Sequence, residues 1–478
     1  MHIIGGIMFV GRENEMSKLG ELYAKGGFQM VVLYGRRRVG KTTLTTEFAK
    51  GKRTLYFTAL EQSDRNNLAD FTRKIQEFFH LPGVSGTFPS WADAFDFLAE
   101  RAAEEPFVFV FDEFPYAAQR NGALPSTLQI AIDHKLASTG MFMILCGSNQ
   151  GFMESKVLGR NSPLYGRRTA QMRIEPLGYL DAGKMLPGLD EQEAFRYYGC
   201  FGGVPYYLSQ IDVALGFREN LTRLYFDPSG FLYDEPMGLL RQELSEPALY
   251  NSILRAIAGG ANKQNEIADR TGIAPTSLPR YLKTLTNLGI IERAVPFGEN
   301  PDTSKRGIYR MRDACYDFWF RFVMPYASDI ESGLGKVIAA TLPDAQLNEY
   351  LGRRFERLCL EWLVMQAQEG KLPIPATTIG SWWGANPATK SQTDIDVLAA
   401  DRIGKTLLIG ECKYREEFNA SDVVNDLHGK RTLVKGYVAD NLYVFAKHPV
   451  SKAVLKANRD AVFMPLEEMY GEKIANRA

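Results

Sequence analysis

One short segment, Gly35-Arg-Arg-Arg-Val-Gly40-Lys41-Thr42, constrains the fold of this chain more than any other feature of its sequence. It has the spacing Gly-x-x-x-x-Gly-Lys-Ser/Thr, follows the apolar run Met30–Tyr34, and opens a predicted helix over Thr43–Lys50. In this context backbone N–H groups wrap phosphates at the positive end of a helix. We expect Lys41 to reach the β- and γ-phosphates of ATP and Thr42 to coordinate Mg²⁺. The expected nucleotide-binding residues of the loop are Gly35, Val39, Gly40, Lys41, Thr42 and Thr43.

Two carboxylates end a second apolar strand, Phe107–Phe111. We expect Asp112 to hold Mg²⁺, directly or through water, and Glu113 to orient and polarise the attacking water. An acidic N-cap on the next helix is an alternative for this pair, and both roles can coexist. A further strand ends in Cys146-Gly-Ser-Asn149, which predicts that Asn149 lies between the two motifs and senses the γ-phosphate.

The first 180 residues alternate short apolar runs with helical stretches such as 91–104 and 125–138. Continuous apolar strands separated by helices are typical of a parallel sheet covered on both faces. The predicted fold class is therefore α/β, with a parallel sheet that carries the phosphate loop.

The segments Phe9-Val-Gly-Arg-Glu13, Phe111-Asp-Glu-Phe114 and Gly147-Ser-Asn149, together with the phosphate loop, resemble the AAA+-related prokaryotic and archaeal ATPases close to the STAND NTPases. The resemblance implies a five-stranded P-loop sheet with a helical lid. It also implies that the segment containing Arg12 lies near the adenine.

Leu164-Tyr-Gly-Arg167-Arg168 resembles the segment of this family whose arginine acts in trans on the nucleotide of a neighbouring subunit. Such a role for Arg167 would require a homo-oligomer. A plain structural or surface arginine is the alternative.

A helix–turn–helix pattern follows. Lys263–Gly272 fits a helix that ends at a glycine, Ile273–Pro275 fits a turn, and Thr276–Gly289 fits a recognition helix with inward leucines. Two short strands, 290–295 and 307–310, complete what looks like a winged helix. Residues 261–310 contain eight Lys/Arg and five Asp/Glu, a net charge of +3, so DNA binding and protein docking both remain open. The outward residues expected to touch DNA are Ser277, Arg280, Lys283 and Thr284.

The last third of the chain has the pattern αβββαβ. Glu411 and Lys413 lie two residues apart on a strand and therefore share a face. Asp396 lies on the preceding strand, with Asp394 as an alternative ligand on the same face. The pattern comprises a helix over 347–368, strands 377–383, 393–399 and 406–413, a helix over 421–434 and a strand over 442–446.

This pattern resembles the PD-(D/E)xK restriction-endonuclease-like superfamily, and specifically a poorly characterised domain often fused to the ATPases above. The resemblance implies that Asp396 and Glu411 hold Mg²⁺, with Glu356 of the long helix as a further carboxylate. Lys413 would position or deprotonate the attacking water. A degenerate copy that keeps the fold without cleaving is the alternative.

These assignments divide the 478 residues into more parts than the roughly three that length alone suggests. The predicted domains are a P-loop ATPase core (1–180), a helical lid (181–245), a winged helix (246–311), an aromatic connector (312–344) and a nuclease-like domain (345–478).

Composition excludes several classes of protein. Fifty-six Lys+Arg balance fifty-six Asp+Glu, which argues against a histone-like protein that coats DNA through bulk charge. No run approaches the ~20 apolar residues of a membrane helix. The five scattered cysteines form no disulfide framework or zinc pair, so we expect a reduced, cytoplasmic protein.

Two functions fit these patterns. The first is an ATP-hydrolysing ATPase coupled to DNA binding and metal-dependent nucleic-acid cleavage. The second is a nucleotide switch that binds protein partners, with an inactive or scaffolding nuclease-like domain.

Overall fold

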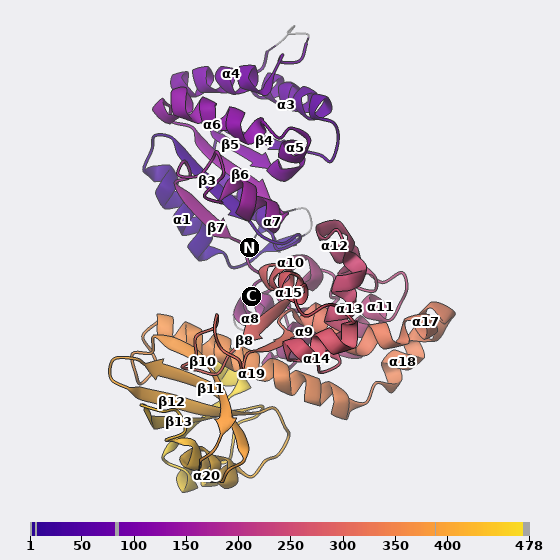
Figure 1. Cartoon of the computed structure of the whole chain (residues 1–478), viewed down its shortest axis with the longest axis vertical. Coiled ribbons are helices and arrows are strands. Elements are labelled where there is room, and N and C mark those ends of the chain that lie inside the picture. The colour runs from indigo at the N-terminus through magenta and orange to yellow at the C-terminus, as the bar shows by residue number, and fades with distance from the viewer. Residues whose placement is uncertain (1, 5–6, 82–85, 388, 472–478) are drawn as a thin grey trace. The chain divides into compact units, whose positions relative to one another are not determined.

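The computed structural model describes residues 2–4, 7–81, 86–387 and 389–471. The chain forms two compact units (Figure 1). The N-terminal unit comprises Met1–Leu177 and Val204–Tyr206, and the C-terminal unit comprises Gly178–Gly203 and Tyr207–Ala478.

The N-terminal unit is built on a five-stranded, fully parallel sheet, which confirms the predicted fold class. The strand order is β4 (Thr54–Thr58), β5 (Val108–Asp112), β6 (Phe142–Gly147), β3 (Gln29–Tyr34), β7 (Ala170–Arg173). A separate antiparallel pair, β1 (His2–Ile4) and β2 (Ile7–Phe9), precedes the sheet.

Both faces of this sheet are apolar because successive side chains point to opposite sides. Met30 and Val32 join one buried cluster, and Val31 and Leu33 join another. The first cluster is closed by α3 (Asp64–Phe78), α4 (Trp91–Glu104), α5 (Phe114–Arg120) and α6 (Leu124–His134), and the second by α1 (Glu13–Ala24) and α2 (Lys41–Ala49) (Figure 1).

Phe57, Phe71, Trp91 and Phe111 pack together within the first cluster, with ring centroids 4.8–6.3 Å apart. Burial of such rings is the largest apolar contribution that single side chains make to a core. The cluster thereby fixes β4 and β5, whose carboxyl ends carry the candidate site.

The C-terminal unit begins with helices, as predicted for residues 181–245. They group with this unit rather than with the parallel sheet, apart from Val204–Tyr206. These helices are α8 (Tyr179–Lys184), α9 (Glu191–Phe201), α10 (Pro205–Leu208), α11 (Phe217–Tyr225) and α12 (Glu235–Glu243).

The helix–turn–helix pattern folds close to its predicted limits. Leu278, Leu282 and Leu285 are buried as expected, whereas Leu288 is only half-buried because α15 ends at Asn287. The elements are α13 (Pro247–Ala258), α14 (Gln264–Thr271), α15 (Leu278–Asn287), and the antiparallel wing strands β8 (Ile291–Ala294) and β9 (Ile308–Met311).

The predicted aromatic connector is a series of short helices and turns. Asp317 and Arg321, the two charges within the aromatic run 316–322, form an ion pair of 2.6 Å one helical turn apart. The regular helices here are α16 (Ala314–Phe318), α17 (Ala327–Asp329) and α18 (Gly335–Thr341), joined by turns at Trp319–Val323, Met324–Tyr326 and Ile330–Leu334. Within the described residues, no helix is long and apolar enough to cross a membrane.

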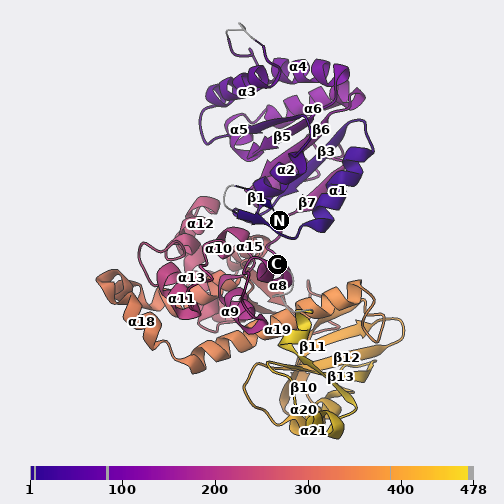
Figure 2. The same ribbon diagram turned by 180° about the vertical axis from the view of Figure 1, so that it is seen from behind.

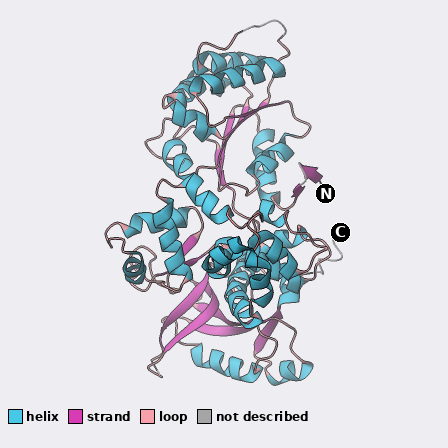
Figure 3. Cartoon of the chain, turned by 90° about the vertical axis from the view of Figure 1, so that its right-hand side faces the viewer, coloured by secondary structure: helices cyan, strands magenta, loops and turns pink. Residues whose placement is uncertain are grey.

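The chain then forms a mixed five-stranded sheet in the order β10-β11-β12-β13-β14 (Figures 2 and 3). β11 is antiparallel to both of its neighbours, β10 and β12, and the last two strands are parallel to β12. The strands are β10 (Thr378–Ala385), β11 (Gln392–Asp401), β12 (Thr406–Lys413), β13 (Val438–Ala446) and β14 (Ala461–Pro465).

Helices cover both faces of this sheet. Val424 and Leu427 of α20 (Ala420–Lys430) pack on Ile409 and Val444, and α21 (Lys452–Ala457) adds to the same layer. Trp362 of α19 (Asp344–Gln368) packs edge-to-face against Phe445, with ring centroids 5.6 Å apart. A final helix, α22, spans Leu466–Met469.

The element order α19-β10-β11-β12-α20-β13 matches the predicted αβββαβ pattern. Two details differ. The helix predicted over 421–434 ends at Lys430, and the sheet gains β14, whose short mixed pattern gave no strand signal. β7 of the N-terminal sheet was missed for the same reason, since none of its four residues is fully buried.

Candidate functional site

The phosphate loop joins the end of β3 to the start of α2. Gly35 and Gly40 have φ angles of 155° and 93°, which favour glycine. A Cβ at Gly35 would lie 2.4 Å from the carbonyl oxygen of Ile174, so no other residue fits there without movement of the backbone. Lys41 is buried, and its Nζ donates to the carbonyl oxygens of Gly35 (2.8 Å) and Arg36 (3.0 Å).

The two predicted magnesium residues of this unit lie together. The Thr42 hydroxyl donates to Asp112 Oδ2 (3.2 Å), and the Tyr56 hydroxyl donates to the same oxygen (3.0 Å). Burial, followed by the nearby charge of Glu113, raises the pKa of Asp112 above its ordinary value. A cation beside Asp112 would favour the ionised carboxylate, so this donor set suits Mg²⁺.

Glu113 follows β5 in a left-handed conformation, with φ of 50°, and occupies the N-cap position of α5. Its side chain gives that helix no cap. Instead, Glu113 Oε2 accepts hydrogen bonds from the backbone N–H (3.1 Å) and the hydroxyl (2.8 Å) of Ser148 at the end of β6. The structure therefore joins the carboxyl ends of β5 and β6 through this glutamate.

Asn149, the predicted γ-phosphate sensor, is the N-cap of α7 (Gln150–Phe152). Its Oδ1 accepts from the Phe152 N–H at 2.9 Å. The cap fixes the side chain beside the end of β6, one residue after Ser148.

Arg12 lies against the phosphate loop. Its guanidinium donates to the carbonyl oxygens of Val39 (2.9 Å) and Glu175 (2.6 Å) and pairs with Glu15 (3.1 Å). Only 8% of the side chain is exposed. Arg12 thus ties the phosphate loop to the segment after β7.

Arg167 forms a two-pronged ion pair with Asp133 of α6, with both N–O distances at 2.7 Å. The hydrogen bonds to this carboxylate raise the pKa of Arg167. A role in trans would therefore require Arg167 to exchange Asp133 for a phosphate.

The predicted DNA-contacting residues lie on or beside α15. Arg280 and Lys283 are exposed, whereas Ser277 and Thr284 are half-buried. Arg280 pairs with Glu246 at 3.5 Å, and the Thr284 hydroxyl donates to the Arg280 carbonyl oxygen at 3.0 Å. Lys283 is the most available of the four for a phosphate.

In the C-terminal sheet, Glu411 lies between two lysines. Its Oε2 accepts from Lys413 Nζ at 2.8 Å and its Oε1 from Lys430 Nζ of α20 at 2.6 Å. Asp396 Oδ2 accepts from the backbone N–H of Cys412 at 2.8 Å. Both carboxylates are thus fixed by hydrogen bonds to β12 or α20.

The predicted carboxylates of this domain influence one another strongly. Burial, and then the charges of Glu411 and Glu356, raise the pKa of Asp396 to about 8. Burial is also the main cause that raises the pKa of Glu356 to about 7, with Asp394 and Glu411 adding to it and Arg310 opposing it. A cation would relieve this repulsion, so the residue types fit a metal. Within the described residues, however, no three side chains are already arranged as a metal-binding group.

Three residues of these sites were missed by sequence reasoning. Tyr56, Ser148 and Lys430 had been assigned no role, and they reach Asp112, Glu113 and Glu411 only through the fold. Ser148 stands inside the Gly147–Asn149 segment, so its position at a strand end was the one available signal.

Comparisons with known families agree with the fold of the N-terminal unit and of the winged helix. Residues 9–211 match an ATPase domain found predominantly in Archaea, and residues 252–294 match the IclR helix-turn-helix domain. Residues 319–424 match a family described as archaea bacterial proteins of unknown function. The fold and the phosphate loop thus define a P-loop ATPase.

A relative is similar over nearly the whole chain. The uncharacterized protein MJECL04 of Methanocaldococcus jannaschii is 31% identical over 463 residues, which cover 96% of this chain and 100% of the relative. The chain belongs to the same family as this archaeal protein.

Solved structures are more distant. The Walker-type ATPase Paby2304 of Pyrococcus abyssi is 21% identical with a TM-score of 0.48, covering 66% of this chain and 96% of that one. The Aeropyrum pernix ORC2 protein is 16% identical with a TM-score of 0.42, covering 70% of this chain and 96% of that one.

Proposed function

We propose that this AAA+-like ATPase couples ATP hydrolysis to DNA binding through the winged helix and to metal-dependent cleavage of nucleic acid in the C-terminal domain. The observation that carries the cleavage proposal is that the charges of Glu411 and Glu356 both act on Asp396, while Glu411 pairs with Lys413. The mutual repulsion of these carboxylates is the kind of arrangement that a divalent cation relieves.

In the ATPase unit, bound Mg²⁺ neutralises charge that develops on the phosphates. Thr42 and Asp112 would hold the ion, since both are already within hydrogen-bond distance of each other. Lys41 would exchange its two carbonyl acceptors for the β- and γ-phosphates. Glu113 would orient the attacking water, and Asn149 would contact the γ-phosphate.

In the C-terminal domain, bound Mg²⁺ polarises the scissile phosphate. Asp396 and Glu411 would hold it, with Glu356 as a further ligand and Asp394 as the alternative. Glu411 would first exchange at least one lysine for the metal, because each of its oxygens accepts from a lysine. Lys413 would then be released to position or deprotonate the attacking water.

The winged helix supports the DNA part of the proposal. Lys283 and Arg280 are exposed on α15, the helix that enters the major groove in this motif. Arg167 would act on a neighbour's nucleotide in a homo-oligomer after leaving Asp133. All five cysteines are free thiols, which fits work in the cytoplasm, where ATP and DNA are available.

A second function is favoured by one specific observation. Both oxygens of Glu411 are already neutralised by lysines, and Lys430 is buried in this arrangement. Such a closed ion-pair cluster suits a domain that scaffolds protein partners while the ATPase acts as a nucleotide switch.

A cleavage assay distinguishes the two functions. Single- and double-stranded DNA would be incubated with Mg²⁺ and ATP, using wild type, Lys41→Ala, Lys413→Ala and the matched exposed-lysine control Lys435→Ala. We expect Lys41→Ala to lose ATP turnover and Lys413→Ala to lose cleavage while it keeps ATP turnover.

The control should match wild type in both readouts. Absence of cleavage by wild type would overturn the nuclease proposal and leave the switch, provided that ATP is still hydrolysed. Unchanged turnover in Lys41→Ala would overturn the assignment of the ATP site.

A further inference from the structure

A large pocket lies within the C-terminal unit, and its lining includes none of the residues predicted to contact DNA or to hold a metal. Its volume is 880 Å³, within the usual range of pockets that hold small ligands. Three segments line it that are distant in sequence: 252–270 of the winged helix, 320–325 of the connector and 346–353 of α19.

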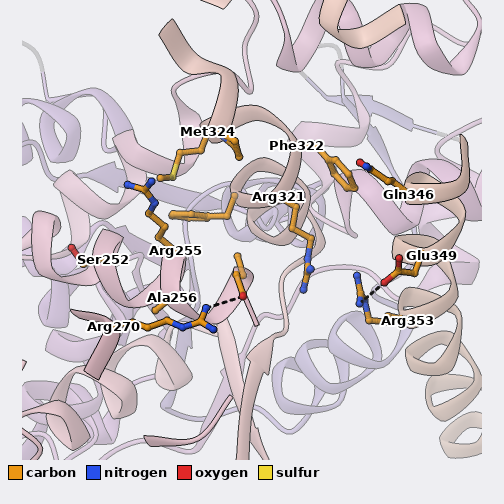
Figure 4. Close-up of a pocket in the computed structure, with 14 residues that line it drawn as sticks. Ser252, Arg255, Ala256, Arg270, Arg321, Phe322, Met324, Gln346, Glu349 and Arg353 are labelled. Carbon is orange, nitrogen blue, oxygen red and sulfur yellow. Dashed lines mark hydrogen bonds and ion pairs between the residues drawn. The ribbon is translucent and has the colours of Figure 1, made fainter. Parts of the chain in front are cut away.

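Four arginines surround this space: Arg255, Arg270, Arg321 and Arg353. In Figure 4, Arg321 projects toward the middle of the pocket, with Arg270 on one side of it and Arg353 on the other. They come from all three lining segments, so the fold gathers charges that the sequence keeps apart.

Carboxylates offset only part of this charge. Arg353 pairs with Glu349 at 3.1 Å, and Arg321 pairs with the buried Asp317 at 2.6 Å. Arg270 donates to the carbonyl oxygen of Gly259 at 2.8 Å, which satisfies one N–H without neutralising the charge. Four guanidinium groups thus face two carboxylates.

Arg255 is the arginine of this pocket whose guanidinium N–H groups are available to bind a ligand. Its side chain makes no hydrogen bond or ion pair with any other described residue, and it is exposed on α13. Phe320 and Phe322, which also line the pocket, are only 4% and 7% exposed, so their rings offer little surface on which a ligand could stack. Polar recognition in this pocket therefore depends on the arginines.

We propose that this pocket binds phosphate groups, carried either by a small phosphorylated ligand of nucleotide size or by the backbone of a nucleic acid. Arginine matches phosphate because its planar fork donates two parallel hydrogen bonds to the oxygens. A bound phosphate offsets the excess positive charge, which is otherwise costly where guanidinium groups share a partly enclosed space. Because its walls come from the winged helix, the connector and α19, the ligand links these three segments.

This inference does not depend on cleavage or on the recognition helix. Binding is measured on the full chain in the Lys41→Ala background, so that the phosphate loop contributes little to the signal. The probes are pyrophosphate and ADP by calorimetry, and a fluorescein-labelled 20-base single-stranded oligonucleotide by polarisation.

The pocket variant is Arg255→Glu with Arg353→Glu. The matched control is Arg402→Glu with Arg459→Glu, two exposed arginines outside the pocket, which changes the net charge equally. We expect the pocket variant to weaken binding of at least one probe by about tenfold or more, and the control by less than about twofold. A single Arg255→Gln variant, which breaks no contact, serves if the double variant does not fold.

The pattern across probes identifies the source of the phosphate. Loss confined to pyrophosphate and ADP indicates a small phosphorylated ligand, and loss confined to the oligonucleotide indicates nucleic-acid backbone. The inference is overturned if no probe binds the protein with the intact pocket, or if the pocket variant and the control bind every probe equally.

Discussion

At the scale of single residues, the ATPase site depends on side chains that orient its proposed catalytic groups through hydrogen bonds. Ser148 donates two hydrogen bonds to one oxygen of Glu113, which itself sits in a left-handed conformation. The serine therefore restricts where the carboxylate can point, although it lies outside the loop that holds the phosphates.

We expect Ser148→Ala to lower kcat for ATP hydrolysis by about tenfold, because one charge-assisted hydrogen bond to Glu113 is lost. KM for ATP should stay near that of wild type, since the phosphate loop is untouched. Steady-state kinetics measure both values. Ser148→Thr, which keeps the hydroxyl, should restore kcat, and a normal kcat in Ser148→Ala would remove the positioning role.

Substitution of Arg12 should affect both the KM for ATP and the stability of the protein. Its guanidinium holds the carbonyl oxygens of Val39 and Glu175 in a nearly buried setting. Arg12→Ala should raise KM for ATP, because Val39 precedes Gly40 in the loop, and should lower the free energy of unfolding by about 2 kcal/mol. Urea unfolding and kinetics test this. Arg12→Lys should recover only part of either loss, because an ammonium cannot form the same fork.

At the scale of elements, ion pairs join the wing to α19. Glu292 of β8 lies 2.5 Å from Arg310 of β9 and 2.8 Å from Arg357 of α19. Burial alone would raise its pKa, but the two arginines outweigh burial and lower the pKa of Glu292 to about 2.

This shift sets the sign of a pH dependence. A carboxyl whose pKa is depressed on folding adds stability above its unfolded pKa, here about 4.3, and that stability disappears as the pH falls through the folded value. Glu292→Gln should therefore cost about 2–3 kcal/mol at pH 7. The difference from wild type should shrink between about pH 4.5 and 2. Denaturant unfolding across this range tests it, and a gap independent of pH would contradict it.

A further prediction concerns DNA binding by α15, the predicted recognition helix. Lys283 is exposed on α15, so Lys283→Ala should weaken DNA binding about equally for all sequences and reduce the salt slope by about 1. Lys336→Ala, an exposed lysine of α18, is the control. Salt titrations of DNA affinity measure both, and an unchanged slope in Lys283→Ala would favour protein docking by the winged helix.

At the scale of the whole molecule, the chain has two compact units, of which only the N-terminal one contains the phosphate loop. A ligand that binds one folded unit stabilises that unit by mass action, by about 2.7 kcal/mol at a concentration one hundred times Kd. ATP with Mg²⁺ should raise the unfolding temperature of the N-terminal unit, and Lys41→Ala should abolish the rise. Calorimetry with and without nucleotide tests this. An equal shift in Lys41→Ala would place nucleotide binding elsewhere.

The sequence predicted those parts of the molecule that local patterns specify. The apolar runs of β3 to β6, the loop over Gly35–Thr42 and the helix over 91–104 could be located because periodicity and motif spacing act over a few residues. Local periodicity also predicted the αβββαβ order and placed Glu411 and Lys413 on the same face of one strand. It failed at β7 and β14, which are short and only partly buried, so that their strand form depends on pairing with a neighbour.

By itself, then, the sequence determined the fold class, the order of elements and the chemical types gathered at strand ends. Only the tertiary structure decided the partners: Tyr56 with Asp112, Ser148 with Glu113, Lys430 with Glu411, and Arg12 with the phosphate loop. It also decided that Arg255, Arg270, Arg321 and Arg353 surround one pocket. The physical reason is that hydrogen bonds and charges act over a few ångströms in space. These partners lie up to tens of positions apart in the sequence, and local patterns do not specify which distant segments the fold brings together.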